Sequence, residues 1–157
     1  MSEIVSISGG YPAPTFSHAA ETFLIAHIAA AAWSTGTAVK YRQTLTILAA
    51  RLAELAPATA ANVAELGTDA GTRALAEAFT AAFGALAPAT RARHLSTVRS
   101  ALTWWRGCGW LAGDPTARWP RPKIPVDTTR ALTRDEVDAL VAAARAAAGQ
   151  DAVAAAV

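Results

Sequence analysis

Apolar residues recur every three or four positions along most of the chain, which is the spacing that places them on one face of an α-helix. A clear example is a stripe whose members step by four, three, four and three positions: Tyr41, Leu45, Leu48, Leu52 and Leu55. Pro57 ends this helix, and a short turn or helix is expected over 58–66. The periodicity predicts an all-α protein with five longer helices over 17–32, 37–55, 69–85, 88–106 and 132–148.

The apolar faces of two helices predict much of the core. In the third predicted helix these residues are Leu75, Ala76, Phe79 and Phe83. In the fourth they are Leu95, Val98, Leu102 and Trp105.

Capping residues indicate where several helices begin. Ser17 is a candidate cap for the first helix, and Thr35 or Thr37 opens the second. Thr133 begins the last long helix, and Glu136 three residues later completes a capping box.

Stretches rich in glycine and proline divide the chain. "PRPKIPVDTT" (120–129) has three prolines in its first six residues, which is typical of an extended linker. Gly149 is expected to interrupt the last helix, after which "DAVAAAV" begins another apolar helical stretch that ends with the chain. We therefore expect a flexible leader at 1–16, a helical domain at 17–118, a linker at 119–130 and the truncated start of a second domain at 131–157.

The composition and the N-terminus argue against several classes of protein. Cys108 is the only cysteine, which excludes an internal disulfide and a multi-cysteine metal site. The apolar run "FLIAHIAAAAW" (23–33) is too short to span a membrane. Because the N-terminus lacks the basic region and apolar core of a signal peptide, we expect a cytoplasmic protein that does not contact a membrane.

Positive charge is concentrated in one segment of the chain. The whole chain has a net charge of +2, whereas residues 88–130 carry a net +6, with Asp114 and Asp127 as their only acids. The eight basic residues of this segment are Arg91, Arg93, Arg99, Arg106, Arg118, Arg121, Lys123 and Arg130. This distribution favours a surface for a polyanion, and an ordinary solvated arginine face is the alternative.

The predicted helix over 88–106 combines hydroxyl and guanidinium groups on its polar side and contains no acid. Arg99 and Arg106 flank its apolar stripe. The residues that point away from the stripe are Arg93, Ser96, Ser100 and Thr103. Short hydroxyls beside arginines suit close contact with phosphates, because both donate hydrogen bonds to anionic oxygens. We therefore favour nucleic-acid contact over a merely solvated face.

No common active-site motif is present. The chain contains no phosphate-binding loop, no dinucleotide-binding glycine pattern and no nucleophile elbow. His18, His27 and His94 do not have the spacing of metal ligands, and Tyr41 is expected to pack in the core. We therefore expect no catalytic residues, no metal, no cofactor and no small-molecule substrate.

Three blocks of the chain, at 34–55, 86–123 and 130–144, resemble the tyrosine recombinases, the phage-integrase family, the first two in its core-binding region and the third in its catalytic domain. "STGTAVKYRQTLTILAARLAEL" resembles the family pattern S-x-x-T-x-x-x-Y-x-x-x-L-x-x-F. "LAPATRARHLSTVRSALTWWRGCGWLAGDPTARWPRPK" resembles the block that leads into the interdomain linker, and "RALTRDEVDALVAAA" resembles the first helix of the catalytic domain. The three blocks together cover about residues 17–148, and their order and spacing are specific.

This resemblance implies a fold and a partner. The expected fold is a SAM-like orthogonal bundle of four to five helices, followed by a proline-rich linker and one or two helices of an incomplete catalytic domain. The expected partners are duplex DNA and, on DNA, other recombinase protomers. The residues that the resemblance assigns to DNA contact are Lys40, Arg42, Gln43, Thr90, Arg91, Arg93, His94, Ser96, Arg99, Arg121 and Lys123. For Arg99 a role in bracing the bundle is the alternative, and Trp104 and Trp105 are expected in the core.

The resemblance also bears on catalysis. Family members cleave DNA with a tyrosine nucleophile assisted by arginine, lysine and histidine residues that lie beyond Val157, so we expect this chain not to cleave DNA. The expected function is DNA binding in site-specific recombination and integration. One alternative is a non-catalytic protein that occupies a recombination site, and another is a helical protein-interaction module.

Overall fold

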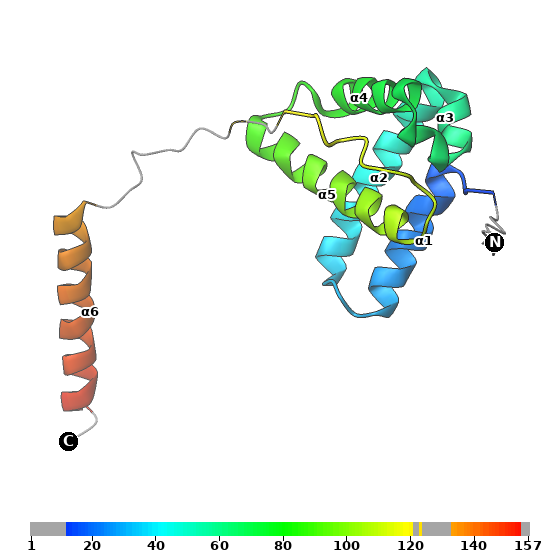
Figure 1. The fold of residues 1–157 in the computed structure, drawn as a ribbon. Helices are drawn as coiled ribbons and strands as arrows, with labels where there is room; N and C mark the ends of the chain where they lie inside the picture. Colours follow the sequence, from blue (N-terminus) through cyan, green and yellow to red (C-terminus); the bar gives the residue numbers. More distant parts are fainter. Residues whose placement is uncertain (1–11, 121–122, 124–132, 155–157) are drawn as a thin grey trace, which may run out of the picture. The chain divides into compact units, whose positions relative to one another are not determined.

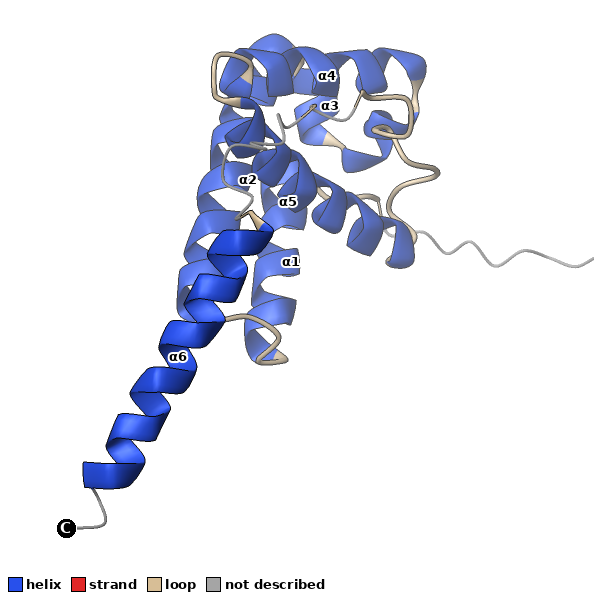
Figure 2. Cartoon of the chain, turned by 90° about the vertical axis from the view of Figure 1, so that its left-hand side faces the viewer, coloured by secondary structure: helices blue, strands red, loops and turns tan. Residues whose placement is uncertain are grey.

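The described part of the chain is entirely helical apart from its connecting loops. The computed structural model describes residues 12–120, 123 and 133–154, and none of them forms a strand (Figures 1 and 2). The elements are α1 (Phe16–Ala29), α2 (Thr35–Leu55), α3 (Pro57–Ala61), the 3-10 helix η1 (Val63–Gly67), α4 (Asp69–Phe83), α5 (Pro88–Gly107) and α6 (Arg134–Ala154). The prediction of an all-α protein is therefore confirmed. The chain divides into two compact units, Met1–Lys123 and Ile124–Val157.

The first two helices begin earlier than predicted. Thr15, not Ser17, caps α1, since its side chain accepts a hydrogen bond from the backbone N–H of His18 at 3.2 Å. Ser34 caps α2 by accepting from the backbone N–H of Thr37, so the helix starts at Thr35. Phe16, which the prediction placed in the leader, is buried in α1. Residues 1–11 of the predicted leader lie outside the described residues.

The first helix also ends three residues before the predicted boundary at residue 32. Its last residue is Ala29, and Ala31 has a φ of 51°, in the left-handed region that a continuing α-helix does not use. The loop that follows turns the chain so that α1 and α2 form an antiparallel hairpin (Figure 1).

The short helical stretch expected over 58–66 is present as α3 and η1. Pro57 is the first residue of α3, where its missing N–H leaves no hydrogen bond unmade. The next helix, α4, begins in close contact with η1 at Gly71, where an added Cβ would lie 1.8 Å from the backbone oxygen of Glu65. Only glycine fits at this position without a backbone shift.

The core lies between the α1–α2 hairpin, α4 and α5. The four core residues predicted on α5 are all buried. Trp105 is fully buried, its ring packs edge-on against Phe16 with centroids 5.1 Å apart, and its indole N–H donates to the carbonyl of Ala19 at 3.0 Å. Trp104 is half-buried and packs against this core.

One predicted core residue of α4 and the last residue of the predicted apolar stripe of α2 are not buried. Leu55 is 52% exposed because it is the last residue of α2, where the chain turns away into α3. Ala76 is only half-buried because it borders an open groove, whereas Leu75, Phe79 and Phe83 of the same helix are buried as predicted.

The second unit is described through α6. The capping box is confirmed, since the Thr133 hydroxyl accepts from the N–H of Glu136 at 3.3 Å and the Glu136 carboxylate accepts from the N–H of Thr133 at 2.7 Å. The expected break at Gly149 is wrong, because α6 continues to Ala154. A glycine costs a helix only about 1 kcal/mol relative to alanine, and the three alanines that precede Gly149 favour continuation.

The predicted linker at 119–130 is described only at Trp119, Pro120 and Lys123, and its other residues lie outside the described part. No helix within the described ranges is long and apolar enough to cross a membrane.

Candidate nucleic-acid interface

A polar contact between α2 and α5 aligns the two helices that carry most of the predicted site. His94 of α5 and Thr44 of α2 are joined by a hydrogen bond of 2.9 Å between Nδ1 and Oγ1. The Thr44 hydroxyl also bonds the backbone oxygen of Lys40 at 3.0 Å, and it must be the donor there because a carbonyl only accepts. The single hydroxyl hydrogen is thus used, so Nδ1 of His94 is the donor to Thr44.

His94 has the surroundings of a packing residue. Its ring stacks on Phe83 of α4, with centroids 4.1 Å apart and planes inclined by 11°. Burial lowers the pKa of His94, since the protonated ring loses solvation there. His94 of α5 therefore contacts both α2 and α4. Its contact with DNA stays a prediction.

Five of the predicted residues are exposed on α2 and α5: Lys40, Arg42, Gln43, Arg93 and Ser96. Lys40 lies one helical turn before Thr44, and Arg93 is next to His94, so both lie close to the point where the two helices meet. Arg93 and Ser96 share one face of α5 with Ser100, three and four positions apart. These residues form the surface that we call the α2–α5 face: Lys40, Gln43, Arg93, Ser96 and Ser100.

Electrostatics favour an anion on the α2–α5 face. Helix α5 contains no aspartate or glutamate, and the only acid of α2 is Glu54, which pairs with Arg51 at 2.8 Å. The N-terminus of α5 has no side-chain cap, which leaves free N–H groups and the positive end of the helix dipole near Thr90. Thr90 itself is half-buried.

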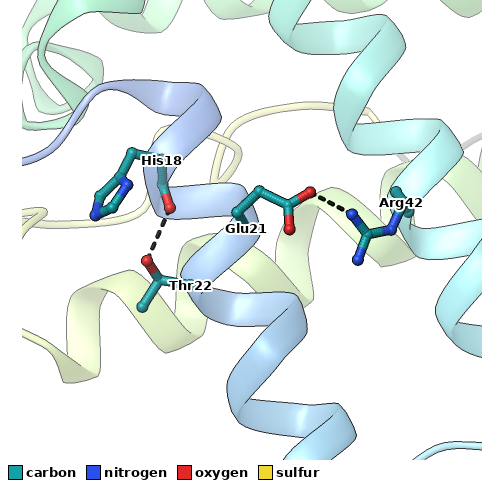
Figure 3. Close-up of polar contacts among 4 residues, drawn as sticks. All are labelled: His18, Glu21, Thr22 and Arg42. Carbon is teal, nitrogen blue, oxygen red and sulfur yellow. Dashed lines mark hydrogen bonds and ion pairs between the residues drawn. The ribbon is translucent and has the colours of Figure 1, made fainter.

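Three predicted arginines have partners within the protein. Arg42 pairs with Glu21 of α1 across the hairpin (Figure 3). Arg91 donates to the carbonyl of Gly84, at the end of α4, at 3.1 Å. Arg99 donates to the hydroxyl and carbonyl oxygens of Thr116 at 3.2 and 3.3 Å, which are the contacts of the alternative bracing role.

The remaining predicted residues lie near the end of the first unit. Lys123 is exposed, and Arg121 lies outside the described residues. In the described part of the chain no three histidine, cysteine, aspartate or glutamate side chains are grouped to hold a metal ion.

Two residues of this region were missed by sequence reasoning. Thr44 is buried and bonds to His94 of α5, and Glu21 is the ion-pair partner of Arg42. Thr44 lies one turn after Lys40 and next to Leu45 of the apolar stripe. This position beside the stripe is the sequence feature that could have indicated its burial. The partner of Arg42 is 21 residues away, and no local pattern indicates it.

Comparison with known proteins gives a partial match. The chain is 43% identical over 61 residues to "Tyrosine recombinase XerD" of Caulobacter vibrioides, and the matched segment covers 39% of this chain. That segment spans about a fifth (20%) of the relative's length. No family model matches the chain, and no solved structure matches it. Over these 61 residues the chain is thus similar to a tyrosine recombinase.

Proposed function

We propose that this chain belongs to the tyrosine recombinases and binds duplex DNA through the α2–α5 face, in DNA recombination and integration. One observation supports this most: two neighbouring helices present exposed Lys40 and Arg93 beside their contact, and α5 contains no acid. The match to a named recombinase supports the same assignment. Exposed hydroxyl, amide and cationic groups are the ones that proteins use on the sugar-phosphate backbone.

Phosphate contact predicts a salt-dependent affinity. If the α2–α5 face and its neighbours neutralise about four to five phosphates, log K should fall with log salt at a slope of roughly −4. A labelled duplex of arbitrary sequence, titrated with the full chain by fluorescence anisotropy at several salt concentrations, measures this slope. Absence of duplex binding at low salt would contradict the proposal and favour a protein-interaction module.

A matched pair of charge reversals tests whether DNA binds at the α2–α5 face. Arg93→Glu should weaken duplex binding about fivefold to tenfold at low salt, because it replaces a phosphate contact by repulsion. Arg73→Glu changes the net charge equally on an exposed position of α4, and should weaken binding less than about twofold. Equal effects of the two reversals would mean that binding follows net charge and not the α2–α5 face. Arg91 is unsuitable for this test because its loss also removes a contact with the end of α4.

We further propose that this chain does not itself cleave DNA. The sequence has two tyrosines, and Tyr11 lies outside the described residues. Tyr41 is half-buried against Trp33, with ring centroids 4.3 Å apart, in a cluster that includes Phe23. Nicked duplexes that trap a phosphotyrosyl bond should therefore give no covalent adduct on a denaturing gel. An adduct that disappears in Tyr11→Phe or Tyr41→Phe would contradict this.

A further inference from the structure

A groove of about 690 Å³ lies beside α4 and the first half of α5. Phe79, Leu95 and Trp119 give it apolar walls, and Trp119 packs on Phe79 with ring centroids 5.4 Å apart. Arg91 and Lys123 also line it, and none of its lining residues is acidic. The groove thus combines an apolar interior with two cationic groups.

The groove is distinct from the α2–α5 face. Successive residues of an α-helix are rotated by about 100°, so Arg91 and Arg93 project to nearly opposite sides of α5. Arg91 shares its side with Leu95, four positions later, and both line the groove. The two arginines therefore serve different surfaces.

The wall formed by Trp119 belongs to the folded bundle. The backbone N–H of Trp119 donates to the carbonyl of Thr116 at 3.0 Å. Thr116 is fully buried, donates to Asp114 at 2.8 Å and accepts from Arg99 at 3.2 Å. Through Arg99 this segment is anchored to α5, so the groove has fixed walls on both sides.

We propose that this groove binds a short acidic peptide segment of a partner protein, with one or two large apolar side chains packed against the walls formed by Phe79, Leu95 and Trp119. Its carboxylates pair with Arg91 and Lys123. Charge complementarity carries this choice, because both charged lining groups are cationic. Duplex DNA would offer phosphates to the cations, but its polar backbone would leave the apolar walls unfilled.

Three acetylated and amidated tetrapeptides test the proposal on the isotopically labelled full chain by NMR: Glu-Leu-Leu-Glu, Lys-Leu-Leu-Lys and Glu-Ser-Ser-Glu. We expect only the first to shift the indole N–H of Trp119 and the amide of Gly84 at millimolar concentration. The Trp119→Phe variant assigns the indole signal among the five tryptophans. Equal shifts by all three peptides, or no shift at these groups, would overturn the proposal.

A charge pair at Thr80 provides the matched variants. Thr80 is exposed on α4 and lines the groove, so both substitutions leave the core intact. Thr80→Glu should weaken binding of the acidic peptide about fivefold and Thr80→Lys should strengthen it about threefold. Affinity unchanged in both variants, each with the parent's circular dichroism, would refute the assignment.

Duplex DNA distinguishes this inference from the proposed function. We expect DNA to bind the Thr80 variants and the parent about equally, and not to displace the peptide. If DNA displaces it and Thr80→Glu weakens DNA binding, the groove is part of the nucleic-acid surface and the peptide proposal fails. If the peptide binds but DNA does not, the proposed function is contradicted and the peptide proposal stands.

Discussion

Helices α5 and α6 have nearly the same length, 20 and 21 residues, and both have an apolar stripe, but only α5 buries it. Leu102 and Trp105 of α5 are almost inaccessible, whereas Leu140 of α6 is 59% exposed and Val137 and Val141 are also exposed. Their charges differ as well, since α5 lacks acids and the first turn of α6 contains Asp135 and Glu136.

This difference shows what apolar periodicity can and cannot indicate. The period gives the face of a helix that is apolar, and for α5 the predicted face is the buried one. Whether that face is covered depends on elements elsewhere in the chain. In α5 the covering residues come from α1 and α2, which precede it by more than 30 residues.

The largest expected contrast is between truncations on the two stripes. Trp105→Ala should lower the free energy of unfolding by about 3–5 kcal/mol, because it removes a fully buried ring and the hydrogen bond that its indole N–H donates to the Ala19 carbonyl. Leu140→Ala should cost less than about 0.5 kcal/mol. Urea denaturation of the full chain, followed by far-ultraviolet circular dichroism, measures both. Similar costs would mean that the stripe of α6 is buried in solution.

A second contrast compares one arginine of each helix. Arg99→Ala should lower the free energy of unfolding by about 1–2 kcal/mol, because Thr116 loses two hydrogen bonds to a charged group. Arg145→Ala, at an exposed position of α6, should change it by no more than about 0.5 kcal/mol. Arg99→Lys separates charge from geometry, since an ammonium group cannot reproduce the paired donors of a guanidinium. Stability equal to the parent's in Arg99→Ala would show that this brace is not formed.

The sequence predicted the helices and the buried stripe of α5 because both follow from local spacing. It did not predict the contacts that organise the candidate site. Thr44 and His94 are 50 residues apart, and Arg99 and Thr116 are 17 apart, so neither pair has a local signature. Lys40, Gln43, Arg93 and Ser96 are exposed, and their contact with DNA stays a prediction, whereas the contacts of Arg42 with Glu21 and of Arg91 with Gly84 depend on where α1 and α4 lie.

The two units should also differ in their response to pH, beginning with the bundle. Burial lowers the pKa of His94 below its unfolded value of about 6.5, so protons bind more tightly to the unfolded chain. The contribution of His94 to stability is complete above that value and decreases as pH falls through it. The urea midpoint should therefore decrease less between pH 7.5 and pH 5 in His94→Gln than in the parent. Glutamine does not titrate and retains a donor for Thr44. As a control, Ser96→Ala on the exposed side of α5 should retain the pH dependence of the parent, because this substitution changes no titratable group.

The smallest effect on stability is expected at the start of α6. It depends on a carboxylate, so it is lost at a lower pH than the effect of His94. Hydrogen bonds from the backbone N–H and then the hydroxyl of Thr133 lower the pKa of Glu136, so the capping box favours the charged carboxylate. Its support for α6 is present above the unfolded pKa of about 4.3 and is lost as pH falls through the lower folded value. Amide hydrogen exchange at Val137 should accelerate relative to the parent in Thr133→Ala but not in Thr133→Ser, which retains the hydroxyl. Exchange at Leu102 of α5 should be the same in all three proteins. If Thr133→Ala changed protection in α5 as well, the two units would not be independent, and the contrast between the two helices would have to be revised.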